Sequence, residues 1–399
     1  MPDAYDFWAA RLPREDLLAI DDFWRRFEPL APRIARFFRG LLPGLDVDRE
    51  LRNALGPLAE RVVGDFEFAP DGAIVLVLTP ELYHSRRMLA RALVDRAPDL
   101  VGWRMRDARW PVAGVTEAVK AILDRSRADA IAVEEITVRR GAHRLVELTA
   151  VGQGDPQFIA DQAGVIFSVL LGERADQDWL GTCNGRARRE RPFRVSIALR
   201  QRPQRRADQW LGPFRAAALS AIESFEADRP QTAFGEKPML VEDCATFRLR
   251  PIGSDPLRRH DAMTYQTRYR ALTAARLAGV KITGLRFSRF GEIFCGLKIR
   301  RAPPHPFDEV ADIASLGTKL EDVLMVTGIG GLIGRASGVE HVYLDLALVD
   351  LERAVEVLRS ALQREGLVGP AWLIFDDAGL EDHYLPLTAK TPESPALAV

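Results

Sequence analysis

The feature that most constrains the fold is a change of hydrophobic period that recurs along the chain. Two short apolar runs on either side of the turn at Asp71-Gly72 predict a β-hairpin. Apolar residues three or four positions apart then predict a helix, and a further strand and helix complete the order β-β-α-β-α. The predicted elements are strands at 65–69 and 73–78, a helix capped by Thr79 with Pro80 at its first position, a strand at 103–110 and a helix at 112–123.

The same order of elements returns in the middle of the chain. Asp155 followed by Pro156 is typical of a helix start, and Gly172 is typical of a helix end. The second set of predicted elements is a pair of strands at 130–138 and 144–151, a helix at 156–171, a strand at 193–199 after a long loop, and a helix from about residue 213.

A third set is predicted towards the C-terminus, where Asp350 caps the last helix and Gly366 ends it. Its elements are a hairpin of 282–289 with 292–299, a helix capped by Asp308, a strand from His341, the helix from Asp350, and a strand at 371–375. Strands mixed with helices in this order indicate an α+β fold of tandem β-β-α-β-α (ferredoxin-like) modules, a divergent repeat.

The N-terminal segment is predicted to be helical before the first module begins. Leu17, Ile20, Trp24 and Phe27 recur on one helical face, and prolines at 29 and 32 are expected to interrupt that helix. A second helix is expected at 48–62. The predicted domains are 1–127 (helices and first module), 128–205 (second module), 206–386 (C-terminal module) and a disordered tail at 387–399.

Composition excludes several classes of function. A net charge of -1 provides no overall field for nucleic acid or an anionic membrane, and no apolar run approaches the roughly 20 residues of a membrane span. The N-terminus lacks the pattern of a signal peptide, and three well-separated cysteines do not form a disulfide framework. We therefore expect a soluble cytoplasmic protein, and the preference for arginine over lysine, with abundant alanine, suggests a bacterial one.

A glycine-rich stretch at 327–338 resembles a nucleotide-binding loop. Gly328, Gly330 and Gly334 lie one residue off the dinucleotide fingerprint, but that loop must leave a strand and enter a helix. Here a helix is predicted before the stretch and a strand after it, so we interpret it as a structural or mobile loop whose glycines satisfy the last helix carbonyls. We expect no bound cofactor and keep Gly328, Gly330 and Gly331 as candidate partner-binding residues.

An arginine cluster at 186–206 is the second candidate site. Arginine forks suit phosphates and carboxylates, but few aromatic residues are interleaved with them, and charge runs are often solvated linkers. The candidate partner-binding residues in this cluster are Arg186, Arg188, Arg189 and Arg191.

The strand from His341 is the third candidate. Alternation places His341, Tyr343 and Asp345 on one face, which would suit acid-base chemistry, although we favour the exposed side of a half-buried sheet. We keep all three as candidate partner-binding residues. The acidic run Asp376, Asp377, Glu381, Asp382 and His383 matches no metal motif and is interpreted as a solvated turn. Cys295 alternates with Ile293 and Leu297 and is expected to face the core.

Some segments resemble elements of uncharacterised bacterial α+β proteins. The resemblance rests on three segments: Asp71-Gly72 through Pro80, Ala97-Pro98 followed by Gly102-Trp103, and Leu171-Gly172-Glu173. The hairpin and the C-terminal β-α-β pattern are similar, more faintly, to the ferredoxin-like domain of ribonuclease E inhibitor B. These families carry no assigned catalytic residues, so the resemblance implies only α+β modules that bind proteins.

Three hypotheses follow for function. The leading one is a non-enzymatic protein-binding protein, such as an inhibitor, an immunity-type protein or an assembly factor. The second is an RNA- or DNA-binding protein that uses 186–206. The third is an enzyme with a site near His341, Tyr343 and Asp345. We expect another protein as partner, with nucleic acid less favoured and no membrane.

Overall fold

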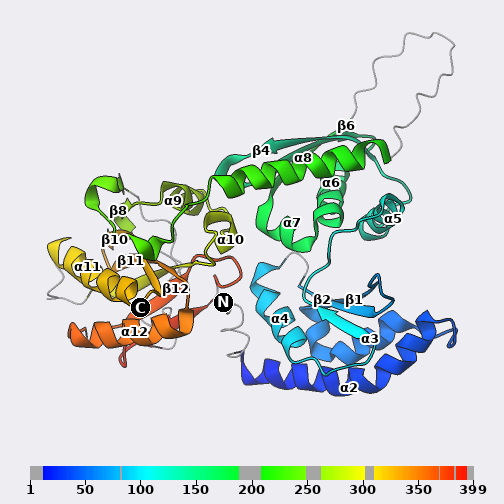
Figure 1. The fold of residues 1–399 in the computed structure, drawn as a ribbon, viewed down its shortest axis with the longest axis horizontal. Coiled ribbons are helices and arrows are strands. Elements are labelled where there is room, and N and C mark those ends of the chain that lie inside the picture. Colours follow the sequence, from blue (N-terminus) through cyan, green and yellow to red (C-terminus); the bar gives the residue numbers. More distant parts are fainter. Residues whose placement is uncertain are drawn as a thin grey trace, which may run out of the picture. The chain divides into compact units, whose positions relative to one another are not determined.

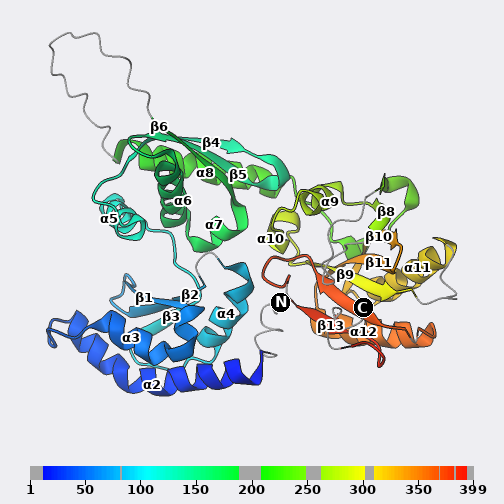
Figure 2. The same cartoon turned by 180° about the vertical axis from the view of Figure 1, so that it is seen from behind.

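The computed structural model describes residues 12–80, 83–187, 208–248, 262–301, 310–367, 369–381 and 383–392. These residues form helices and three sheets, which confirms the α+β class (Figures 1 and 2). The chain divides into two compact units. The first contains Met1–Val62, Tyr83–Leu100 and Arg229–Val399, and the second contains Val63–Leu82 and Val101–Asp228. The predicted domain boundaries at 127 and 205 remain predictions.

The N-terminal segment forms one helix, α2 (Arg14–Phe38), with Pro29 and Pro32 inside it. The expected interruption at these prolines is therefore wrong. Each proline removes the donor for the carbonyl four residues earlier, and those carbonyls belong to Arg25 and Glu28, which lie at exposed positions where water can satisfy them. The helix can continue because its buried face is unaffected.

The second helix is shorter than expected. Asp46 caps α3 (Val47–Leu55) by accepting a 3.0 Å hydrogen bond from the Arg49 N–H, and a 3₁₀ turn, η1 (Gly56–Glu60), replaces the rest. Gly56 ends α3 because it has a φ of 54°, in the left-handed region. The 3₁₀ turn η2 (His84–Arg86) leads into α4 (Arg87–Asp95), which contacts α2 where the Trp24 indole donates to the Leu93 carbonyl at 2.9 Å.

The first predicted hairpin is confirmed in the second unit. Strands β1 (Val63–Phe68) and β2 (Ile74–Thr79) are antiparallel, and β3 (Trp103–Arg106) pairs in parallel with β2. The expected helix start at Thr79 is wrong, because β2 runs through Thr79 and its hydroxyl bonds to the Glu173 carboxylate instead of capping a helix. After β3 comes α5 (Val115–Ser126).

A second three-stranded sheet repeats this order and these directions. Strand β4 (Val133–Arg140) is antiparallel to β5 (Val146–Gly152), with the 3₁₀ turn η3 (Ala142–Arg144) between them, and β6 (Leu180–Ala187) is parallel to β5. Between β5 and β6 lie α6 (Pro156–Leu171) and α7 (Glu173–Trp179). The Asp155 cap is confirmed, since its side chain accepts a 3.0 Å bond from the Phe158 N–H, and Gly172 ends α6 with a φ of 90°.

The third strand of this sheet does not lie where the sequence pattern predicts it. It lies at 180–187, which was predicted as part of a long loop, whereas the strand expected at 193–199 falls outside the described residues. The helix α8 (Asp208–Ala227) follows. Glycine at 185 explains the error, because it weakens a strand pattern yet is required here: a Cβ would lie 1.7 Å from the Pro156 carbonyl at the start of α6.

The C-terminal part of the first unit contains a seven-stranded sheet in which neighbouring strands are antiparallel. Its spatial order is β13-β12-β9-β11-β10-β8-β7. The strands are β7 (Ala245–Arg248), β8 (Ala262–Thr267), β9 (Ile293–Arg300), β10 (Gly330–Gly338), β11 (His341–Leu348), β12 (Ala371–Phe375) and β13 (Tyr384–Pro386). The 3₁₀ turns η4 (Phe234–Glu236) and η5 (Val241–Asp243) precede β7.

The third predicted hairpin is wrong. Residues 284–287 form a short helix, α10 (Gly284–Phe287), and Ile282 makes only an isolated bridge to Asp377. Strand β9 instead pairs with β11 and β12, which come later in the chain. The expected cap Asp308 lies outside the described residues. The Asp350 cap is confirmed, because its carboxylate accepts a 3.1 Å bond from the Arg353 N–H at the start of α12 (Leu351–Arg364).

Helices cover both faces of the seven-stranded sheet. Helices α11 (Val310–Val326) and α12 pack on one face, against side chains that include Cys295, Leu297 and Leu344. The expectation that Cys295 faces the core is therefore confirmed. The other face is covered by α9 (Arg270–Leu277), α10 and η4, which pack on Phe294, Ile333 and Ala347. Figure 1 shows α12 below the strands and α9 above them.

In the part of the chain that the structure describes, no helix is both long and apolar enough to cross a bilayer. Leu387, at the start of the predicted tail, is buried, and its N–H donates to the Ala371 carbonyl at 2.9 Å. Residues 393–399 lie outside the described residues.

Candidate functional site

The glycine stretch forms a strand rather than the expected loop. Gly328 ends α11 with a φ of 69° and donates its N–H to the Met325 carbonyl at 3.0 Å, as expected of a glycine after a helix. Strand β10 then begins at Gly330 and pairs with β11 and β8. A strand, not a helix, leaves the stretch, so it does not have the geometry that holds a pyrophosphate.

The glycines of β10 allow the backbone of η4 to lie directly on the strand. A Cβ on Gly331 would lie 2.4 Å from the Phe234 carbonyl oxygen, and one on Gly235 would lie 2.6 Å from the Gly330 carbonyl oxygen. Gly334 serves another contact, because its Cβ would lie 3.0 Å from the Tyr265 hydroxyl. Gly330 and Gly331 are therefore buried by the fold itself, and of the candidate partner-binding glycines only Gly328 is exposed.

The candidate residues on β11 lie inside the molecule. The predicted alternation holds, but His341, Tyr343 and Asp345 are 7%, 0% and 0% exposed, so the expectation of an exposed polar face is wrong. The reason is that α9 and β8 bring Tyr265 and Arg276 over this face. These three side chains therefore do not form a flat exposed sheet face.

Asp345 belongs to a buried ionic network in the first unit. Its Oδ2 atom accepts from the Tyr265 hydroxyl and, at 2.8 Å, from Nη1 of Arg276. The same guanidinium donates to both carboxylate oxygens of Asp376, at 3.2 and 2.7 Å. Burial alone lowers the pKa of Arg276, but the carboxylates of Asp345 and Asp376 hold it well above its ordinary value. The guanidinium charge thus has two carboxylate partners, and a buried cation needs at least one to be stable.

The C-terminal acidic run is also used within the fold. Asp376 pairs with Arg276, and Asp377 accepts hydrogen bonds from the N–H groups of Gly284 at 3.0 Å and Gly379 at 2.9 Å. Asp382 lies outside the described residues. Among the described residues, no three His, Cys, Asp or Glu side chains are grouped so that they could hold a metal ion.

Arg186 lies on an exposed sheet face of the second unit. Helices α6 and α8 pack on one face of the β4–β5–β6 sheet, against Val146, Leu148 and Ala150. The register places the alternate side chains of all three strands on the opposite face. Those residues are Glu135, Thr137, Arg139, Glu147, Thr149, Val151, Asn184 and Arg186. Arg188, Arg189 and Arg191 lie outside the described residues.

A cluster of charged side chains that the sequence analysis missed lies in the second unit. At its centre the buried carboxylate of Glu173, at the start of α7, accepts from the Thr79 hydroxyl and, at 3.1 Å, from the Arg109 N–H. Gln177 donates to the same carboxylate at 3.4 Å, and the Arg109 guanidinium lies 3.9 Å away. Glu173 thus links β2 and the segment after β3 to α7.

Two further ion pairs extend the cluster across the first sheet. Arg109 lies 3.2 Å from Asp65, and Arg106 lies 3.5 Å from Glu67. The Arg106 guanidinium also stacks 3.4 Å from the ring centroid of Trp110, whose side chain is 59% exposed. Trp110 is therefore a large exposed aromatic residue with a guanidinium stacked on its ring.

Several pKa values are shifted in this cluster. Burial, together with the neighbouring carboxylate of Glu173, raises the pKa of Asp176 to about 7. Burial likewise raises the pKa of Glu67 and lowers those of Arg106 and Arg125. Shifted values gather at functional sites, although structural ion-pair networks also produce them. The Asp176 carboxyl can gain or lose a proton near neutral pH.

One sequence signal could have indicated the cluster. Asp65 and Glu67 alternate on β1, and Arg104 and Arg106 alternate on β3, so each pair lies on one face of its strand. Pairing across a hairpin and a crossover would bring the opposite charges onto the same face of the sheet. Nothing in the spacing indicates that Glu173, far along the chain, joins them.

Comparison with known proteins adds no assignment to this geometry. No protein-family model, no curated protein and no solved structure matches this chain.

Proposed function

We propose that this protein acts by binding another protein and not by catalysis, and that the partner contacts the second unit at the Arg106–Trp110 stack. The observation that carries the proposal is a tryptophan that is 59% exposed with a guanidinium 3.4 Å from its ring centroid. Tryptophan and arginine are enriched among the few residues that carry most of the binding energy of protein interfaces.

The stack has the properties of an interface anchor before any partner arrives. Arg106 is only 14% exposed and is paired with Glu67, so the guanidinium and the ring are held in place. Holding a side chain in place reduces the conformational entropy that binding costs. Burial of the remaining Trp110 surface against a partner would then contribute to affinity with little ordering cost.

The test compares Trp110→Ala with the unchanged protein in the native lysate. Val101→Ala is the matched control, because Val101 is fully exposed in the same unit. The unchanged protein, Trp110→Ala and Val101→Ala each serve as bait, and the proteins that each captures are quantified. A captured protein whose amount falls with Trp110→Ala is then purified, and its Kd for each bait is measured directly. We expect Trp110→Ala to weaken that complex about 30-fold, the value for a hot spot of about 2 kcal/mol. Equal capture and equal Kd for all three proteins would exclude the stack as an anchor.

The repeated strand order supports a further part of this proposal. The β1–β2–β3 and β4–β5–β6 sheets share one order and one set of directions, which supports a divergent tandem repeat, and we propose that its modules are ferredoxin-like. We include in the proposal a relation to the uncharacterised bacterial α+β proteins, with ribonuclease E inhibitor B as a fainter relative, and a cytoplasmic location.

A second candidate function is nucleic-acid binding through the β4–β5–β6 sheet. The observation that favours it is the exposed Arg186 at the end of β6, from which the arginine-rich segment continues in sequence. Binding of single-stranded RNA should fall steeply with salt and be lost on combined replacement of Arg188, Arg189 and Arg191 by Ala. Arg52→Gln, at an exposed arginine of α3, is the control, and salt-insensitive binding would contradict this candidate.

A further inference from the structure

A groove in the first unit lies between α2 and α3, outside the charged cluster. Its volume is about 470 Å³. Arg26, Leu30 and Arg33 line it from α2, and Glu50 and Asn53 line it from α3. Arg26 and Arg33 are seven residues apart, so they occupy the same face of α2 about 10 Å from each other along its axis.

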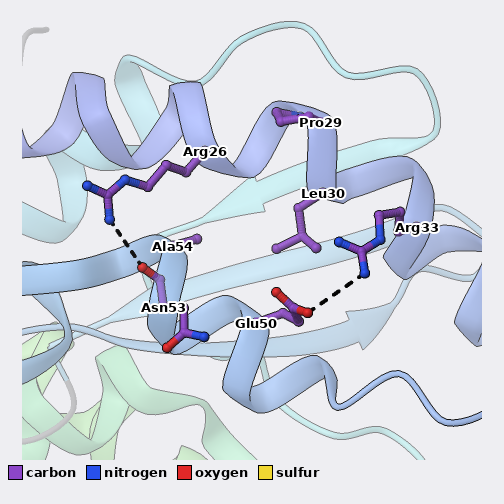
Figure 3. Close-up of a pocket in the computed structure, with 7 residues that line it drawn as sticks. All are labelled: Arg26, Pro29, Leu30, Arg33, Glu50, Asn53 and Ala54. Carbon is purple, nitrogen blue, oxygen red and sulfur yellow. Dashed lines mark hydrogen bonds and ion pairs between the residues drawn. The ribbon is translucent and has the colours of Figure 1, made fainter.

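The floor of the groove is apolar. Leu30 lies between the two arginines in sequence, and Ala54 faces it from α3 (Figure 3). Both are buried, at 6% and 5% exposed. A ligand that fits this groove therefore presents one apolar group between two groups that accept hydrogen bonds from arginine.

Both guanidiniums form ion pairs within the protein, and these pairs lie at its surface. Nη2 of Arg26 lies 2.5 Å from Asp22 and its Nη1 donates to the Asn53 carbonyl at 3.5 Å, while Nη2 of Arg33 lies 3.8 Å from Glu50. The side chains of Arg26 and Arg33 are 52% and 54% exposed. Such exposed pairs contribute at most about 1 kcal/mol each, so an incoming carboxylate can replace them.

We propose that this groove binds an acidic helical segment of a protein partner, with two carboxylates seven residues apart and an apolar side chain between them. This inference rests on the proposed protein-binding function. On a partner helix, two carboxylates seven residues apart have the same spacing along the axis as Arg26 and Arg33 on α2. Each carboxylate can therefore contact one guanidinium at the same time. An open groove with half-exposed arginines suits a helix better than a small molecule, because small-ligand sites bury most of their ligand.

The test measures binding of a synthetic peptide to the full chain at low ionic strength. The probe is an alanine-rich helical peptide with two glutamates seven residues apart and a leucine four residues after the first. The control peptide has glutamines in place of the glutamates. Arg26→Gln and Arg33→Gln should each weaken the Kd up to about fivefold. Arg36→Gln, an exposed arginine of α2 outside the groove, should leave the Kd unchanged.

Glu50→Gln supplies a change of opposite sign. It removes the carboxylate that competes for Arg33, so the acidic peptide should bind more tightly to this variant. Equal affinity for the two peptides would overturn the proposal, as would unchanged binding by the Arg26→Gln/Arg33→Gln double variant. No binding at peptide concentrations on the order of 1 mM would also overturn it. These failures leave the Trp110 experiment unaffected, so the two proposals fail separately.

Discussion

Gly331→Ala tests whether the backbone contact between η4 and β10 is rigid. The new Cβ would lie 2.4 Å from the Phe234 oxygen, 2.8 Å from its carbonyl carbon and 3.0 Å from the Gly235 Cα. Restoring normal separations of about 3.5 Å requires η4 to move away by about 1 Å. Two hydrogen bonds oppose that movement: the Phe234 N–H donates to Glu292 at 2.7 Å, and Arg268 donates to the Phe234 carbonyl at 2.6 Å.

The expected loss follows from these contacts. Weakening two hydrogen bonds at about 1 kcal/mol each gives a destabilisation of about 2 kcal/mol, within the range for an overpacked core. Gly317→Ala is the matched control, because this glycine lies inside α11 and its Cβ would make ordinary contacts of 3.4 and 3.5 Å. That variant should gain up to about 1 kcal/mol from helix propensity.

The assay is urea denaturation followed by far-ultraviolet circular dichroism, with amide hydrogen exchange to localise the effect. Gly331→Ala should lower the free energy of unfolding and speed exchange in β10, whereas Gly317→Ala should raise that free energy. A Gly331→Ala protein as stable as the original would refute the reasoning, because it would mean that η4 moves away at no cost.

Three further outcomes are expected. Asp345→Asn removes one of the two carboxylate partners of Arg276, while Asp376 still compensates its charge, and should destabilise the first unit by about 1.5–3 kcal/mol in urea denaturation; a loss below about 1 kcal/mol would contradict this. Because folding raises the pKa of Asp176 to about 7, its contribution to stability is full below about pH 4 and is lost as the pH rises through 7. The melting temperature of the unchanged protein should therefore fall between about pH 4 and pH 7, and that of Asp176→Asn should fall less. Parallel curves of melting temperature against pH for the two proteins would count against the raised pKa. Burial raises the pKa of Cys183 to about 12, so an alkylating reagent at pH 8 should modify Cys244 first, as mass spectrometry can show; earlier modification of Cys183 would be inconsistent with its burial.

Local features of the fold could be predicted because their causes lie within a few residues. Asp155 and Asp350 each cap a helix through an N–H three positions later, and Gly172 ends α6 through its own backbone conformation. The alternation of β11 was correct for the same reason, since period two is a property of the strand itself.

The burial of that strand could not be predicted, because it depends on a distant helix. Tyr343 and Asp345 look like exposed polar residues until Arg276 from α9 compensates the buried charge. Likewise β10 is a strand because β8 and β11 supply its hydrogen bonds, although its glycines have low strand propensity. The charged cluster needs Glu173 to meet Arg109, a contact that only tertiary structure creates.

The order of the seven-stranded sheet places short strands at both of its edges. In the described residues β7 has 4 residues and β13 has 3, while β9 and β11, near the middle, have 8 each. An edge strand offers unpaired backbone groups to neighbouring molecules, and Pro386 in β13 has no N–H to offer. At the β13 edge a second molecule can therefore add only a few hydrogen bonds, so that edge is a poor template for fibrous aggregation even in concentrated solution.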